Sequence, residues 1–95
     1  MFIVRIEHPV QDYGRGKAVF DIDPLGRQKS GVRRYSVLRP TDDPKYIMID
    51  LEFDDAVKAE VFRTALRNMW NNPEAQRIMQ NPKVQVVEPV ETREF

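Results

Sequence analysis

The sequence predicts an α+β fold in which four strands and two main helices follow the order β-α-β-β-α-β. Two stretches carry this prediction. The stretch KYIMIDLEF (45–53) alternates large apolar side chains with others, which is the period of a strand with one buried face. Residues 55–71 instead repeat their apolar side chains at helical spacing, which is typical of a helix that lies on a sheet.

The first strand is predicted over residues 1–9. Its side chains alternate in the same way, and Pro9 ends it because proline lacks a backbone donor. His8, the only histidine of the chain, continues the parity of the apolar residue Ile6. We therefore expect His8 at the end of the strand, on or beside its buried face.

Helical signals follow the first strand. Asp12 is expected to cap a helix that ends near Ile22. The next stretch, DPLGRQKSG, predicts a second and shorter helical piece over residues 23–31. In this interpretation Asp23 is its N-cap, Pro24 occupies the first helical position and the glycine at its end stops it.

A hairpin is predicted next. Residues 32–39 and 45–53 form its strands, and the breaker-rich stretch PTDDP between them forms its turn. The long helix over 55–71 begins at Asp54 or Asp55, either of which is a suitable cap. A short last helix is predicted over 73–80, because Asn-Pro favours a helix start.

The fourth strand is predicted over residues 83–91, and Pro89 within it favours a position at a sheet edge or in a bulge. The resulting order is that of the ferredoxin-like fold, with the expected sheet order 4-1-3-2 and both main helices on one face. The opposite face would then carry a polar and charged set of side chains. This set consists of Arg5, Glu7, Met48, Asp50 and Glu52.

Composition narrows the possible functions. A chain of 95 residues fits a single domain, 1–95, and its formal net charge of zero argues against a nucleic-acid binder. No apolar run approaches the length of a membrane span, and no signal-peptide pattern precedes the first strand, so the cytoplasm is the expected location. The absence of cysteine and the single histidine argue against a metal site.

Charge is unevenly distributed along the chain. Residues 1–45 hold nine Lys and Arg against six Asp and Glu, and residues 46–95 hold six against nine. Such a dipolar layout favours the docking of two copies.

The stretches HPVQDY, FDIDPLGRQKSGVRRYSVLRPTDDP and IDLEF, taken with this order, resemble antibiotic-biosynthesis-monooxygenase-like small uncharacterised bacterial proteins of the dimeric α+β barrel superfamily. The resemblance covers nearly the whole chain. It implies a homodimer whose sheets pack face to face, and a cleft between sheet and helices that holds a small, often aromatic, molecule. Cofactor-free oxygenation, isomerisation and structural roles all occur on such scaffolds, so the resemblance implies no cofactor and no one reaction. No catalytic residue is carried over from it.

The expected topology brings several chemistry-bearing residues to one rim of the sheet. His8 is the candidate general base, because a histidine beside a carboxylate accepts protons near neutral pH. The candidate ligand-binding residues are Tyr13, Arg39 and Tyr46. The remaining members of this rim are Asp42, Asp43 and Lys83. The competing interpretation, which we favour for His8, is a histidine at the core edge that is hydrogen-bonded to a loop.

Three other features have structural explanations that we favour. The charged set around Asp50 and Glu52 is expected to be paired within a dimer rather than to act as acid and base. The basic run 27–35 is expected to be a solvated face, although it could contact phosphate. Trp70 is expected to pack against the fourth strand or the last helix, with a pocket wall as the alternative.

Two functions therefore remain. The first is a small homodimeric enzyme, or a binder of a small organic molecule, with a cleft near His8, Tyr13 and Tyr46. The second is a non-enzymatic structural or interaction domain. A preformed apolar pocket with convergent polar groups favours the first, and a filled core at His8 favours the second.

Overall fold

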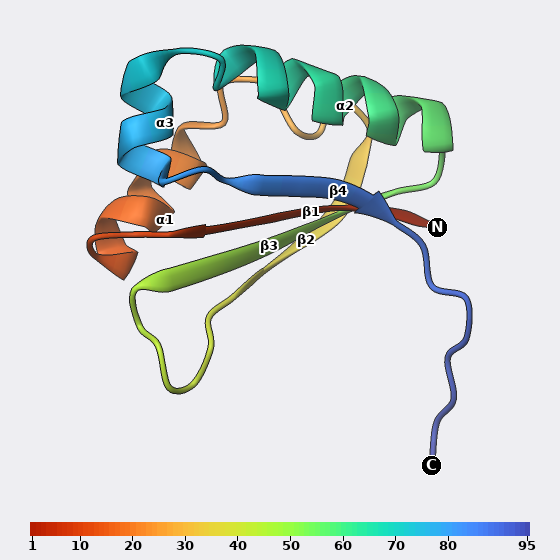
Figure 1. Ribbon diagram of the computed structural model, residues 1–95. Coiled ribbons are helices and arrows are strands. Elements are labelled where there is room, and N and C mark those ends of the chain that lie inside the picture. The colour runs from red at the N-terminus through yellow and green to blue at the C-terminus, as the bar shows by residue number, and fades with distance from the viewer.

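Four antiparallel strands form one sheet, and the helices gather on one side of it, in the computed structural model of residues 1–95 (Figure 1). The strands and helices, in chain order, are β1 (Phe2–Pro9), α1 (Tyr13–Ile22), β2 (Val32–Leu38), β3 (Tyr46–Phe53), α2 (Ala56–Met69), α3 (Pro73–Met79) and β4 (Lys83–Val87). The sheet order is β2-β3-β1-β4, which is the predicted 4-1-3-2 order read from the other edge. The ferredoxin-like arrangement is thus confirmed, and no helix is both long and apolar enough to cross a bilayer.

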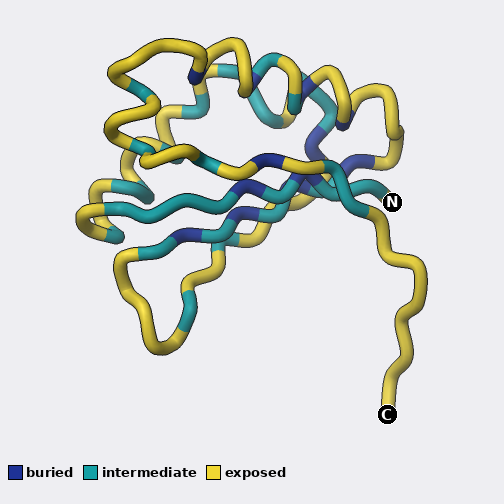
Figure 2. The backbone as a smooth tube through the Cα atoms, viewed as in Figure 1, coloured by how far each residue is buried: buried dark blue, intermediate teal, exposed yellow.

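The core lies between the sheet and α2. Strand pairing places Ile6 opposite Ile49 and His8 opposite Ile47. The alternating apolar side chains of both central strands therefore face the helices. Figure 2 shows the buried positions gathered in the strands and along the sheet-facing side of α2. The buried side chains are Val4, Ile6, Val32, Ile47, Ile49, Leu51, Phe53, Ala59, Phe62, Leu66, Trp70 and Val84.

The helix α2 is well anchored at its start and along one stripe. Asp55 caps it, because its carboxylate accepts hydrogen bonds from the backbone N–H groups of Val57 and Lys58 at 2.7 and 3.3 Å. The rings of Phe62 in α2 and Phe53 in β3 lie 5.6 Å apart between their centroids, which fixes the helix over the sheet.

The helix α1 is held more loosely. Asp12 caps it as predicted, by accepting a hydrogen bond from Gly14 at 3.1 Å, but the helix contains no buried residue. Gly16 allows the chain to pass close to Val10, because a Cβ at Gly16 would lie only 2.8 Å from Cγ1 of Val10. The apolar contacts of this helix with the core come from half-buried side chains, Tyr13 and Phe20, so an outward shift of α1 exposes less apolar area than a shift of α2 would.

The prediction of a short helical piece over residues 23–31 is wrong, because this segment is a series of turns. Asp23 adopts φ 54°, which is left-handed, and its backbone N–H closes the end of α1. An N-cap needs an extended backbone, so Asp23 cannot start a helix from this conformation. Its carboxylate instead accepts a hydrogen bond from the backbone N–H of Arg27 at 2.8 Å, and Gly26 and Gly31 also adopt positive φ.

The fourth strand is shorter than the predicted 83–91 and ends at Val87. Val87 pairs with Ile3, and β1 begins only one residue earlier, at Phe2, so the ladder has almost no partner left for a longer strand. The chain from 88 to 95 then leaves the sheet as an extended tail on the side away from the helices (Figure 1). The predicted bounds of the other elements agree with the structure to within two residues.

Candidate functional site

A cleft of about 110 Å³ lies between the inner face of the sheet, α1 and α2. We call it the helix–sheet cleft. Its only polar side chains are His8, Asp23 and Arg27. The apolar side chains that line it are Ile6, Val19, Phe20, Pro24, Leu25, Leu51, Phe62, Leu66, Met69, Trp70 and Met79. An apolar hollow with a few polar groups is the usual form of a site for a small organic molecule.

His8 is half-buried in this cleft, where the pairing of β1 with β3 places it on the inner face. Its Nδ1 atom lies 2.9 Å from the carbonyl oxygen of Pro9. A carbonyl oxygen only accepts, so Nδ1 carries the hydrogen and donates it. The Nε2 atom of the neutral ring is therefore left as an acceptor, and it makes no hydrogen bond within the chain.

The electrostatic surroundings of His8 favour its neutral form. Burial among apolar side chains lowers the pKa of His8 below its usual value, and the hydrogen bond to the Pro9 carbonyl opposes this only in part. The ring is thus able to accept a proton at neutral pH, which is the state that a general base requires.

Arg27 stands between the helix–sheet cleft and the protein surface, since it lines both the cleft and an outer groove along β2. Its Nε atom lies 3.3 Å from the carboxylate of Asp23, and Nη1 donates a hydrogen bond to the carbonyl oxygen of Phe20 at 2.9 Å. The guanidinium carbon also lies 3.8 Å from the centroid of the Phe20 ring. These contacts fasten the 23–31 segment to the end of α1 and close one side of the cleft.

The structure does not bring the predicted ligand-binding residues together around His8. The guanidinium of Arg39 lies over the ring of Tyr13, 4.9 Å from its centroid, and neither residue lines the helix–sheet cleft. Tyr46 pairs with Pro9 in the ladder and faces the opposite side of the sheet, where its hydroxyl donates a hydrogen bond to Glu7 at 3.1 Å. Burial and this hydrogen bond raise the pKa of Tyr46 above its usual value.

Asp43, an acidic member of the predicted rim, has a local structural partner instead. Asp43 accepts a hydrogen bond from the backbone N–H of Lys45 at 3.0 Å, which stabilises the turn before β3. No hydrogen bond or ion pair joins His8 to Asp42 or Asp43, so His8 has no carboxylate partner in the chain.

The sheet face away from the helices, which we call the open face, carries the predicted charged set in paired form. Arg5 and Asp50 form two hydrogen bonds, and Arg34 binds Glu52 with 2.6 Å between Nε and Oε2. Pairing lets a second sheet cover this face without leaving an isolated charge buried.

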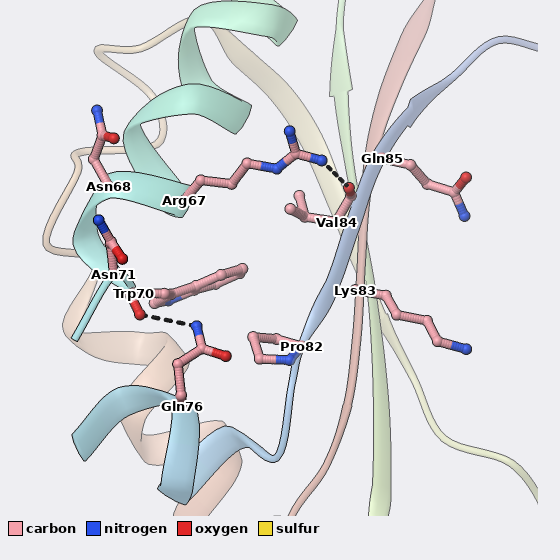
Figure 3. A pocket seen from close by; sticks show the side chains of 9 residues that line it. All are labelled: Arg67, Asn68, Trp70, Asn71, Gln76, Pro82, Lys83, Val84 and Gln85. Carbon is pink, nitrogen blue, oxygen red and sulfur yellow. Dashed lines mark hydrogen bonds between the residues drawn. The ribbon is translucent and has the colours of Figure 1, made fainter. Parts of the chain in front are cut away.

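A larger hollow of about 620 Å³ lies between the end of α2, α3 and β4. Figure 3 shows Arg67 reaching from α2 to the carbonyl oxygen of Val84, at 3.4 Å, while Lys83 and Gln85 point away from the hollow. Gln76 donates a hydrogen bond to the carbonyl oxygen of Trp70 at 3.0 Å, so the polar groups here mainly complete the ends of the helices.

Trp70 is buried and borders both hollows, so it packs against β4 and also forms a wall of the helix–sheet cleft. Sequence reasoning missed the roles of Asp23 and Arg27, because their approach depends on consecutive tight turns that have no periodic signal. The two glycines at positive φ were the available sign of such turns. No group of three His, Asp or Glu side chains lies close enough to hold a metal ion.

Comparison with known proteins identifies the class of fold to which this chain belongs. No family model and no curated protein matches the chain. Solved structures do match it along almost its whole length. The fold is ferredoxin-like.

A dimeric ferredoxin-like protein from an uncultured marine organism superposes with a TM-score of 0.65 at 13% identity, over 99% of this chain and 97% of that one. SnoaB, a cofactor-independent oxygenase from Streptomyces nogalater, gives 0.63 at 15% identity, over 96% and 93% of the two chains. An antibiotic biosynthesis monooxygenase gives 0.55 at 13% identity, over 96% and 100%. These are the kinds of protein that the sequence resembles, and at such identities the likeness concerns the fold.

Proposed function

We propose that this protein is a homodimer that binds a small, mainly apolar organic molecule in the helix–sheet cleft, with His8 as the group that accepts its proton or hydrogen bond. The observation that carries the proposal is an apolar cleft whose lining includes the only histidine, with one ring nitrogen free to accept. We also propose the cytoplasm as its location.

The chemistry follows from the surroundings of His8. Its Nε2 atom accepts a proton from a weakly acidic O–H or C–H group of the bound molecule. The imidazolium that forms keeps its Nδ1–H bond to the Pro9 carbonyl, which offsets part of the cost of a charge among apolar side chains. Isomerisation and cofactor-free oxygenation both begin with such a proton transfer, and the fold shared with a cofactor-independent oxygenase supports this pair of reactions.

The proposal gives the other predicted ligand residues lesser roles. Tyr13 and Arg39 are rim residues beyond the cleft lining, and they contact the bound molecule only where it extends out of the cleft. Tyr46, on the open face, contacts a ligand only where that ligand lies between two protomers.

The homodimer is supported by the open face and by a dimeric neighbour of the same fold. In a single chain this face is left uncovered, and its charges are arranged in pairs across the strands. A domain of this size buries a small core, so covering a sheet face with a second copy adds substantially to its stability.

A second candidate is a non-enzymatic domain that only associates with itself. The small volume of the cleft, about 110 Å³, favours this candidate, because sites for drug-sized ligands are several times larger. The loose attachment of α1, which has no buried residue, is the feature that lets the cleft widen under the first proposal.

The test uses the single tryptophan and the single histidine as probes of the cleft. Native mass spectrometry of the purified protein reports any co-purified molecule. Titration with p-cresol, a small aromatic molecule with a weakly acidic hydroxyl, is then followed by the NMR signals of the Trp70 indole and the His8 ring. If p-cresol binds in the cleft, both signals shift, and the shifts reach a plateau as the p-cresol concentration rises.

A matched pair of variants identifies the site. Val19→Phe places a large side chain at an exposed position that lines the cleft, so it abolishes the shifts and leaves Trp70 as the only tryptophan. Ile78→Phe introduces the same side chain at an exposed position outside the cleft and leaves them intact. The proposal fails if no molecule co-purifies and p-cresol moves neither probe, and the non-enzymatic candidate then remains.

A further inference from the structure

A second hollow, of about 590 Å³, follows the outer edge of β2, and we call it the β2 groove. Three arginines line it, Arg27, Arg33 and Arg34, against a single carboxylate, Asp23. Strand β2 is an edge of the sheet, so its outer backbone groups have no strand partner. A basic groove beside an unpaired strand edge is suited to an extended, acidic peptide segment.

The arginines of the β2 groove keep donors free even though each has a carboxylate within its own chain. The Nε atom of Arg33 lies 3.2 Å from the carboxylate of Asp54, and that of Arg34 lies 2.6 Å from the carboxylate of Glu52. Their side chains are 71% and 74% exposed. A guanidinium has five N–H donors in a fork, so each of these arginines can bind a second carboxylate.

The chain itself contains a segment of matching chemistry. The tail over 88–95 carries Glu88, Glu91 and Glu94 against one arginine, and none of these carboxylates forms an ion pair. The tail is extended, and the side chains of Val90 and Phe95 are almost fully exposed. It leaves the sheet on the side of the open face, away from its own helices (Figure 1).

We infer that the tail of one protomer docks in the β2 groove of a second copy of this chain. The inference rests on the homodimer of the proposed function and extends it to a specific contact. The acidic residues of the tail bind the arginines of the groove, and the backbone of the tail pairs with the unpaired edge of β2.

The sheet order makes this contact geometrically natural. When two sheets pack face to face about a two-fold axis that runs along the strands, β4 of one protomer lies opposite β2 of the other, because these strands are the opposite edges. Packed sheets are separated by about 10 Å. An extended tail of eight residues reaches about 26 Å, so it spans this separation with several residues to spare. The route to its own β2 would cross the open face, which the partner occupies.

Engineered cysteines test the contact directly, because the natural chain has none. One variant carries Thr92→Cys in the tail and a second carries Gln28→Cys, which lines the groove. The two are mixed, exchanged and oxidised mildly with diamide. We expect a disulfide-linked heterodimer in the mixture, well above the yield with Asn68→Cys, an exposed control position on α2 near the opposite edge of the sheet.

Charge exchange provides an independent measurement. Glu91→Arg in the tail and Arg33→Glu in the groove should each weaken dimerisation about fivefold or more, since a symmetric dimer contains every contact twice. The double variant should recover most of the loss. Arg15→Glu, an equal charge change at an exposed residue of α1, should leave the dimer unchanged.

The outcomes separate this inference from the proposed function. The tail contact is overturned if the protein is a dimer but the mixed cysteine variants form no disulfide-linked heterodimer and Glu91→Arg leaves dimer affinity unchanged. The homodimer then remains in place. A chain carrying both Thr92→Cys and Gln28→Cys that closes a disulfide within itself also overturns it. A mass near 11.2 kDa by light scattering at micromolar concentration removes the homodimer and the tail contact together.

Discussion

Arg5 and Asp50 face one another across the β1–β3 ladder and form a two-point ion pair, with 2.8 Å between Nε and Oδ1 and 2.9 Å between Nη2 and Oδ2. The hydrogen bond and charge of Asp50 raise the pKa of Arg5 further. The pair lies at the centre of the open face. The side chain of Asp50 is only 18% exposed, so its carboxylate is already largely shielded from solvent. A second sheet that covers this face would therefore bury a charge pair that is already formed.

The first prediction concerns this pair. Asp50→Ala leaves the guanidinium of Arg5 without its partner, and in a dimer interface that charge is desolvated. We expect dimer affinity to fall at least about tenfold, while the isolated fold loses only about 1 kcal/mol because the pair is part-exposed there. Sedimentation and urea unfolding measure the two effects. Glu60→Ala, which removes an exposed carboxylate on α2 paired with Arg63, is the control. Unchanged dimer affinity and stability for Asp50→Ala would refute the idea of a paired interface cluster.

The second prediction concerns the core. Ile49 is 4% exposed in the central strand β3 and pairs with Ile6 on one side and Val37 on the other. Ile49→Ala should lower the free energy of unfolding by roughly 2–5 kcal/mol, through lost burial and the cavity that remains. Val61→Ala, at an exposed position of α2, should change it by about 0.5 kcal/mol or less. Equal effects of the two substitutions in chemical denaturation would contradict the assigned core.

The fold was predictable where the sequence has a strong period. Strand β3 and helix α2 carry periods of two and 3.6. In β3 the buried residues are those that the period selects, whereas in α2 only Phe62 and Leu66 of the apolar stripe are buried, and Val57 and Val61 are exposed. The segment 23–31 was misassigned, since Asp23 and Pro24 satisfy the residue preferences of a helix start equally well when Asp23 closes the preceding helix. Local preference does not distinguish these two uses of the same residues.

The candidate site was predictable only in part. Parity placed His8 on the inner face, where the structure has it. The expected rim grouped residues by their end of the sheet without separating its two faces, and so it included Tyr46, whose parity directs it to the open face. The position of Arg27 beside Phe20 depends on the turns of the 23–31 segment, and no pattern in the sequence specifies it.

The third prediction compares two glycines of α1. Alanine is favoured over glycine in a helix by roughly 1 kcal/mol. At Gly14 a new Cβ has only ordinary contacts, so Gly14→Ala should raise the thermal midpoint. At Gly16 the new Cβ would lie 2.8 Å from Cγ1 of Val10, a branched and stiff side chain, so Gly16→Ala should be the less stable of the two variants. Thermal unfolding followed by circular dichroism ranks them, and the reverse order would show that α1 does not pack on Val10.

The fourth prediction concerns the protonation of His8. Burial lowers its pKa in the folded chain, so between the usual histidine value of about 6.5 and that lowered value the unfolded chain binds a proton that the folded chain does not. Stability must therefore fall as pH decreases through this window, and above about pH 6.5 His8 contributes no pH dependence. His8→Gln keeps hydrogen-bonding capacity and removes the titration. We expect the wild type to lose more stability than His8→Gln between pH 7.5 and pH 5.0.

The protonation of His8 also distinguishes its two possible roles, structural and proton-accepting. The ring signal of the only histidine is followed by NMR against pH, and its midpoint should lie below about 6.5. His8→Leu should destabilise the fold more than His8→Gln, because it leaves the Pro9 carbonyl without its donor. A proton-accepting role predicts in addition that p-cresol shifts the midpoint, since the bound hydroxyl and the Nε2 atom share a proton. A midpoint at or above 6.5, unmoved by p-cresol while Trp70 still reports binding, would leave His8 with a structural role only.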